Sequence, residues 1–81
     1  MMYTAIITIE LKKGMLDPEA TAIRHALANL GFETGALSSA RMFKIELEAQ
    51  DKEAAQVTAT EMCERLLANP VIHSYSVEVR E

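Results

Sequence analysis

The chain has 81 residues, of which 49% are apolar, and its twelve acidic and eight basic side chains give a formal net charge of −4. This length allows a single domain, residues 1–81, and the apolar share excludes a disordered chain. Nucleic acid is disfavoured as a partner, because phosphate binding needs a concentrated basic surface. A domain this small buries a modest share of its surface, and oligomerisation is a common remedy.

The cysteine content and the N-terminus indicate the compartment. The single cysteine cannot form an internal disulfide, which fits a reducing cytosol. The first residues alternate in polarity instead of forming a continuous apolar run, and no basic segment precedes them. We therefore expect no signal peptide, no membrane span and a cytoplasmic location.

The first half of the chain predicts a strand followed by a helix. Residues 3–11 place apolar, often β-branched side chains at every second position, which is typical of a strand. Asp17 suits the N-cap of a helix, Pro18 suits its first position, and Gly31 suits the left-handed residue after its end. The apolar stripe of this helix consists of Ala20, Ile23, Ala26, Leu27 and Leu30.

The second half repeats the pattern after a less regular stretch. Residues 35–49 predict a hairpin that turns near Ser39 to Arg41, and only its second strand alternates clearly. Asp51 is the next predicted N-cap. The inner face of the second helix is predicted to consist of Ala55, Ala59, Met62, Cys63 and Leu66. The pair Asn69-Pro70 should end this helix, with the last strand beginning at Val71.

The predicted order is therefore β-α-β-β-α-β. It indicates an α+β protein, a ferredoxin-like two-layer sandwich with two helices on one face of an antiparallel sheet. The sheet has three strands if the middle hairpin is one bent strand. On the open face, we expect Ile6, Met42 and Ile72 to offer apolar surface for sheet-to-sheet association.

No residue pattern predicts chemistry by this chain. Cys63 lies at helical spacing on the inner face, which favours a small buried hydrophobe over a nucleophile. His73 falls on the apolar phase of its strand, and His25 stands alone, so neither has the partners that a metal site needs. The three glycines are isolated, and no phosphate-binding loop is present. We predict no catalytic, cofactor-binding or metal-binding residue.

Two stretches resemble the PurS family. Residues 11–32, LKKGMLDPEATAIRHALANLGF, resemble the first half of PurS, and residues 61–79, EMCERLLANPVIHSYSVEV, resemble its end. The central stretch departs from the family, because it keeps Arg41 and Lys44 but lacks the glycine of the usual Arg-x-Gly-Lys-like turn.

The resemblance implies an accessory subunit of phosphoribosylformylglycinamidine synthase, a ligase of de novo purine biosynthesis. PurS would join the synthetase subunit PurL, which uses ATP and magnesium, to the glutaminase subunit PurQ, so that ammonia from glutamine reaches activated formylglycinamide ribonucleotide. It implies a homodimer or a dimer of dimers, without catalytic residues of its own. The predicted structural or interface residues are Lys13, Gly14, Leu16, Asp17, Pro18, Asn69, Pro70, Val71 and Ile72.

Two alternatives remain open at this point. An ACT-type regulatory domain shares the plan and often dimerises, and its ligand loop would be KKGMLDP, although this loop lacks a glycine-rich cradle. A free-standing enzyme would show activity as an isolated chain, and no base or nucleophile indicates one.

Overall fold

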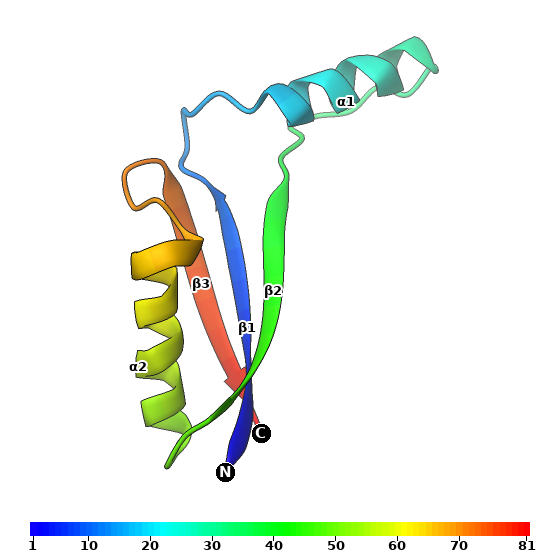
Figure 1. The fold of residues 1–81 in the computed structure, drawn as a ribbon. Helices are drawn as coiled ribbons and strands as arrows, with labels where there is room; N and C mark the ends of the chain where they lie inside the picture. Colours follow the sequence, from blue (N-terminus) through cyan, green and yellow to red (C-terminus); the bar gives the residue numbers. More distant parts are fainter.

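The computed structural model describes residues 1–81 as a three-stranded sheet with two α-helices (Figure 1). The elements follow the order β1 (Met2–Leu11), α1 (Pro18–Asn29), β2 (Ala40–Glu48), α2 (Lys52–Met62), a π-helical turn η1 (Cys63–Leu67) and β3 (His73–Arg80). The strand order is β2-β1-β3, and both pairings are antiparallel. Neither helix is long and apolar enough to cross a membrane. The α+β class and the antiparallel sheet are confirmed, in the three-stranded form.

The sheet has one apolar and one mostly polar face. The register places Ile7 of the central strand opposite Phe43 on one side and Val77 on the other. Alternation along the strands sends all three side chains to the face that α2 covers. On the opposite face Thr8 lies between Met42 and Ser76.

Helix α2 packs closely on the sheet because its inner side chains are small. The Asp51 carboxylate caps the helix by accepting a hydrogen bond from the Ala54 amide at 2.8 Å. Ala55, Ala59 and Cys63 then follow at intervals of four residues and are completely buried. They complete a core with the inner residues of the sheet: Tyr3, Ala5, Ile7, Ile9, Leu47 and Val79.

The end of this helix differs from the prediction. The Ala68 amide donates to the Cys63 carbonyl at 2.9 Å, five residues back, so the last turn is wider than an α-helical turn. The wider turn rotates the following side chains, and Leu67 packs against the core while Leu66 is 84% exposed. The placement of Leu66 on the inner face was therefore wrong, since α-helical spacing ends at Cys63.

The ends of α1 match their sequence signals. The Asp17 carboxylate accepts from the Ala20 amide at 3.0 Å, and Pro18 occupies the first turn. Gly31 has φ +94°, which allows the Phe32 amide to bond the Leu27 carbonyl at 2.9 Å. This is the Schellman arrangement, in which a left-handed residue closes the last turn of a helix.

Helix α1 does not pack on the sheet. It projects beyond the end of the strands, and residues 30–39 return along it (Figure 1). We call residues 15–39 the arm and the rest of the chain the body. The molecule measures 51 × 25 × 15 Å, and its radius of gyration is 16.2 Å, against about 12 Å for a compact domain of this length.

The predicted placement of both helices on one face is therefore wrong for α1. The reason lies in the topology. Because β1 and β2 are antiparallel neighbours, paired from Met2 with Glu48 to Glu10 with Ala40, the end of one lies beside the start of the other. Their connection does not have to cross the sheet, so nothing draws α1 over its face. In α1 only Ala20 is buried.

The predicted first strand of the middle hairpin is also absent. Residues 35–39 form no strand, and β2 is a single strand. Leu37 instead lines a cleft together with Ala20 and Arg24 of α1. The Arg24 guanidinium approaches the Thr34 carbonyl at 3.5 Å. The segment is thus held along the helix and pairs with no strand of the sheet.

Candidate functional site

The two groups of predicted interface residues meet at one end of the sheet. Leu11, the last residue of β1, lies opposite His73, the first residue of β3. The Lys12 amide donates to the Ile72 carbonyl at 2.8 Å, which ties the loop after β1 to the corner before β3. Residues 13–18 and 69–72 therefore form one surface at the base of the arm, which we call the arm end.

The loop at the arm end begins with a tight turn. The Met15 amide donates to the Lys12 carbonyl at 3.0 Å, and Gly14 has φ +89° in the third position of this turn. That position takes positive φ in type II turns, which favours glycine. Lys13 and Leu16 are exposed on either side of it. The turn thus presents a charged and an apolar side chain to solvent.

Asp17 holds the base of the arm together. One carboxylate oxygen accepts from the Ala20 amide, and the other accepts from the Ser39 hydroxyl at 3.0 Å. These two hydrogen bonds lower the pKa of Asp17, with the bond from Ala20 contributing most. Ser39 was expected near a hairpin turn. Its hydrogen bond to Asp17 joins residues 22 positions apart, so no local sequence pattern predicts it.

The corner before β3 is a hydrogen-bonded turn. The Asn69 carbonyl accepts from the Ile72 amide at 3.0 Å and from the His73 amide at 2.7 Å. Its side-chain oxygen accepts from the Val71 amide at 3.0 Å. β-turns favour asparagine at their first position and proline at their second, which Asn69 and Pro70 occupy here. The predicted start of the strand at Val71 was wrong, because residues 70–72 form the turn and β3 begins at His73.

His73 contributes to this corner through its ring. Its Nδ1 accepts a hydrogen bond from the Asn69 amide at 2.9 Å, which requires this nitrogen to be unprotonated. The side chain is half-buried. His73 is therefore a packed structural residue in this chain.

Cys63 lies in the core and is 0% exposed. Burial, with a smaller effect from Glu64, raises the pKa of its thiol, which disfavours the reactive thiolate.

The Tyr75 hydroxyl donates a hydrogen bond to Glu64 at 3.0 Å. Burial raises the pKa of Tyr75 most, and this hydrogen bond raises it further. No group of three or more His, Cys, Asp or Glu side chains is placed to hold a metal ion.

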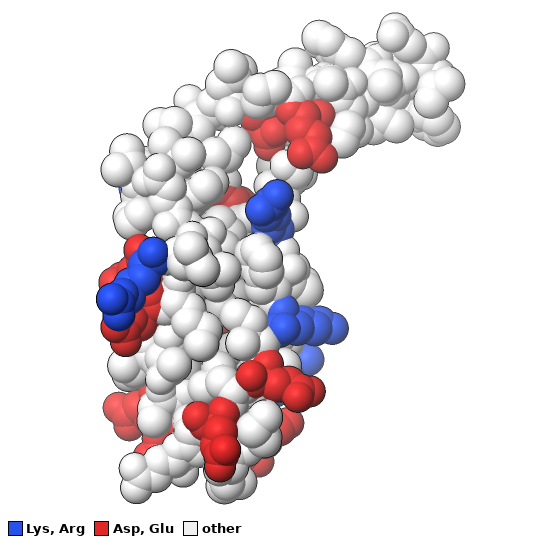
Figure 2. Space-filling view, in the orientation of Figure 1, with Lys and Arg blue, Asp and Glu red and all other residues white.

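Two hollows were not foreseen from the sequence. A polar hollow of about 570 Å³ at the arm end is lined by residues that include Asp17, Arg41 and His73. Figure 2 shows acidic side chains at the base of the arm. An apolar groove of about 430 Å³ lies between α2 and β2, with Ile45 and Met62 in its wall. Both depend on contacts between distant segments.

The open face of the sheet agrees in part with the expected apolar surface. Ile6 and Met42 lie on it, Ile6 half-buried and Met42 exposed. Ile72 does not, because it belongs to the turn before β3. The correction follows from the start of β3, since a residue outside the strand does not share its alternation.

These features define a class: a small ferredoxin-like α+β domain with a tight core under one helix and a second helix extended into solvent. The family model described as "PurS: Phosphoribosylformylglycinamidine (FGAM) synthase" matches residues 4–81.

Individual relatives agree with this match. The PurS subunit of Archaeoglobus fulgidus is 47% identical over 78 residues, covering 95% of this chain and 98% of the relative. The Bacillus subtilis subunit is 36% identical over 81 residues, covering 99% and 95%. The crystal structure of Methanocaldococcus jannaschii PurS has a TM-score of 0.88 at 40% identity, covering 98% of this chain and 96% of that one.

A chain in the structure of PurLQS from Thermotoga maritima has a TM-score of 0.88 at 28% identity, and 96% of each chain is covered. This chain belongs to the PurS family of phosphoribosylformylglycinamidine synthase subunits. Membership in this family sets aside the ACT-type alternative.

Proposed function

We propose that this chain is the bridging subunit of phosphoribosylformylglycinamidine synthase and carries no catalytic residue. It would hold a PurL synthetase and a PurQ glutaminase in fixed relation, so that ammonia passes between their active sites. Ammonia protonates in water, so confinement depends on positioning. ATP, magnesium and glutamine would be used by the partner subunits, and the assembly would act in the cytoplasm.

The observation that carries the proposal is the PurS family match over residues 4–81, together with the complete burial of Cys63. The related chain from Thermotoga maritima belongs to a structure named PurLQS, which supports PurL and PurQ as partners. The buried thiol has no exposed position from which to attack a substrate. A subunit without a placed nucleophile contributes to such an enzyme through contacts.

The proposal includes a homodimer or a dimer of dimers. The chain exposes 6155 Å², whereas a compact monomer of 9.0 kDa exposes about 4,850 Å². The difference of about 1,300 Å² exceeds the roughly 800 Å² that each partner contributes to a standard interface. An isolated monomer would therefore leave an unusually large surface uncovered.

The arm end is the proposed contact surface for PurL or PurQ. Lys13, Leu16 and Val71 stand exposed within it. They surround a backbone fixed by Gly14, Asp17, Pro18, Asn69, Pro70 and Ile72. A rigid surface with exposed apolar and charged side chains is suited to a specific partner, since little ordering is needed on binding.

Reconstitution tests the bridging role. Purified PurL and PurQ are assayed for glutamine-dependent conversion of formylglycinamide ribonucleotide, with and without this chain. We expect conversion only when it is added, and none from the chain alone. Full glutamine-dependent turnover by PurL and PurQ without it would refute the proposal.

Two variants test its parts. Cys63→Ala should leave reconstituted activity near normal, and complete loss with the assembly intact would show that the thiol takes part.

Val71→Asp should weaken co-purification with PurL or PurQ, whereas Val57→Asp serves as the matched control, because Val57 is similarly exposed on α2, away from the arm end. Equal binding by both variants would exclude Val71 from the contact.

A further inference from the structure

One hydrogen bond of the corner before β3 depends on the protonation of a side chain. The other bonds of this corner end on the carbonyl and the side-chain oxygen of Asn69, which do not change charge with pH. The Asn69 amide, by contrast, donates to Nδ1 of His73 at 2.9 Å. A protonated imidazole carries a hydrogen on both nitrogens and accepts no hydrogen bond. Protonation of His73 therefore sets two donors against each other and breaks this bond.

The two histidines of the chain differ in their surroundings. Histidine is the side chain that ordinarily changes charge between about pH 5 and pH 8. His25 is exposed on α1, out on the arm. His73 is half-buried and is the one whose ring closes a backbone turn. A change of charge on His73 thus alters the fold at the arm end, whereas a change on His25 does not.

Carboxylates near His73 favour its charged ring in a second position. His73 lines the polar hollow together with Glu10 of β1, Asp17 and Glu19 at the base of the arm, and Arg41 of β2. Glu10 and Glu19 form no ion pair, whereas Asp17 already accepts two hydrogen bonds. Three carboxylates against one guanidinium make the hollow negative, which stabilises a cationic ring that turns into it.

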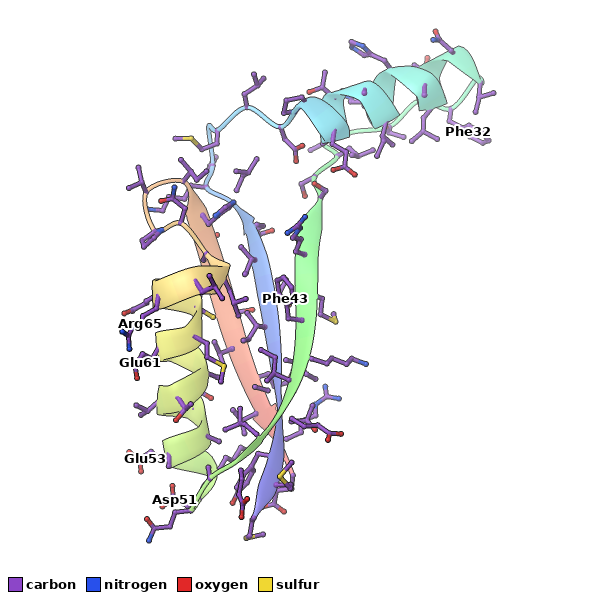
Figure 3. The ribbon with its side chains drawn as sticks, in the orientation of Figure 1. Phe32, Phe43, Asp51, Glu53, Glu61 and Arg65 are labelled. Atoms are coloured by element: carbon purple, nitrogen blue, oxygen red, sulfur yellow. The ribbon has the colours of Figure 1, made fainter.

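The other elements around the ring carry charged groups that are already engaged. The loop after β1 carries Lys12, which bonds the corner through its backbone amide. On η1, Glu64 accepts from the Tyr75 hydroxyl at 3.0 Å. The Arg65 guanidinium pairs with Glu61 at 3.1 Å on the outer side of α2 (Figure 3). The carboxylates of the hollow are therefore the partners left for a protonated ring.

We propose that His73 is a proton-sensitive latch of the arm end. The neutral ring holds the Asn69 amide and keeps the corner closed, with Val71 presented to a partner subunit. The protonated ring leaves the amide and turns toward the carboxylates of the hollow, so the corner loosens. This proposal rests on the arm-end contact of the proposed function and specifies its regulation.

The direction of the pH effect follows from the acceptor. The bond from Asn69 exists only with the neutral ring, so its contribution is present at neutral pH and is lost as the pH falls and His73 gains a proton. A partner that binds the closed corner should therefore bind more weakly in acid. By reciprocity, a bound partner opposes protonation of the ring.

Amide exchange in the free chain tests the latch directly. Protection of the Asn69 amide is compared at about pH 7.5 and about pH 5.5, after correction for the intrinsic pH dependence of exchange. We expect roughly a two- to tenfold loss of protection in acid, which corresponds to one ordinary hydrogen bond. Equal protection at the two pH values would overturn the proposal. So would a ring that carries its hydrogen on Nδ1 at the higher pH, as seen by nitrogen-15 NMR.

His73→Asn separates the hydrogen bond from the charge. The side-chain oxygen of asparagine accepts at every pH, so we expect this variant to keep the protection and to lose the acid response. His73→Ala has no acceptor and should be unprotected at both pH values. Circular dichroism must show that each variant is folded, and His73→Gln supplies a second uncharged acceptor if His73→Asn is not. An acid response that survives in the folded acceptor variant would refute the latch.

His25→Asn is the matched control, because it removes the other histidine from an exposed position. We expect it to keep the full acid response of the parent chain. Asp17 does not contribute in this interval, because its pKa lies below the ordinary value of about 4. Loss of the response in His25→Asn would assign the effect to the arm and overturn the proposal.

Partner binding separates the latch from the bridging role. Co-purification with PurL and PurQ is measured at both pH values for the parent and for His73→Asn. We expect the parent to bind several-fold more weakly in acid and His73→Asn to bind more evenly. Equal acid losses in both chains would refute the latch and leave the bridging role intact. No binding by the parent at the higher pH would refute the bridging role, while exchange in the free chain still decides whether the latch exists.

Discussion

The two helices begin in the same way and end in different surroundings. Each has an aspartate N-cap that accepts from an amide three residues on, Asp17 from Ala20 and Asp51 from Ala54. Each has a glutamate in its first turn. Helix α2 buries alanines against the sheet, whereas α1 leaves most of its apolar stripe exposed. Capping thus fixes where a helix starts, and topology determines what it packs against.

The largest expected effect lies in the body, under α2. Ile7→Ala removes a completely buried side chain of the central strand, and we expect it to lower the free energy of unfolding by about 2–5 kcal/mol. Ile6→Ala, next to it on the open face, should cost clearly less. Urea denaturation of both variants measures the difference. Equal losses would mean that the two faces of the sheet are equally covered in solution.

The turn before the arm should give the next largest effect. Gly14→Ala forces an unfavourable positive φ on alanine, with an expected cost of about 1–3 kcal/mol. Gly35→Ala, within the arm, is the control, because Gly35 has no positive φ and an added methyl group meets no atom within 4 Å. Thermal denaturation should place Gly14→Ala below the parent and Gly35→Ala near it. A loss confined to Gly35→Ala would contradict the turn geometry.

Removing the cap of α2 should have a smaller effect. Asp51→Ala deletes the hydrogen bond to the Ala54 amide, and we expect a loss of about 0.5–2 kcal/mol in the free energy of unfolding. Asp51→Ser keeps an acceptor at the N-cap and should recover most of it. Because α2 packs on the sheet, the loss should appear in global unfolding by urea. No loss in Asp51→Ala would show that packing alone fixes the start of this helix.

The smallest effect concerns pH and the base of the arm. The folded-state pKa of Asp17 lies below its ordinary value, so its ionised form stabilises the arm above about pH 4. This stabilisation is lost as the pH falls through the folded-state pKa. Amide exchange at Ala20, corrected for its intrinsic pH dependence, should therefore accelerate in acid, and Asp17→Asn should flatten this response. An unchanged acid response in Asp17→Asn would assign it to another group.

Much of the local structure could be predicted from local signals. The cap residues Asp17 and Asp51, the left-handed Gly31 and the alternation along β1 and β2 all agree with the structure. Motif resemblance also identified the family, and the residues it singled out lie together at the arm end. Their contacts with partner subunits are a prediction, because the exposure of a surface does not identify the protein that binds it.

The errors arose from contacts between distant segments and from turns that depart from regular helix or strand geometry. The contact of Ser39 with Asp17, the exposure of Leu66 after the π-helical turn and the departure of α1 from the sheet have no local sequence signal. The sequence by itself determined the helix starts, the end of α1, the strand faces and the family, since these depend on neighbouring residues. Only the tertiary structure decided the strand order, and antiparallel pairing of β1 with β2 is the physical reason that the arm stands free.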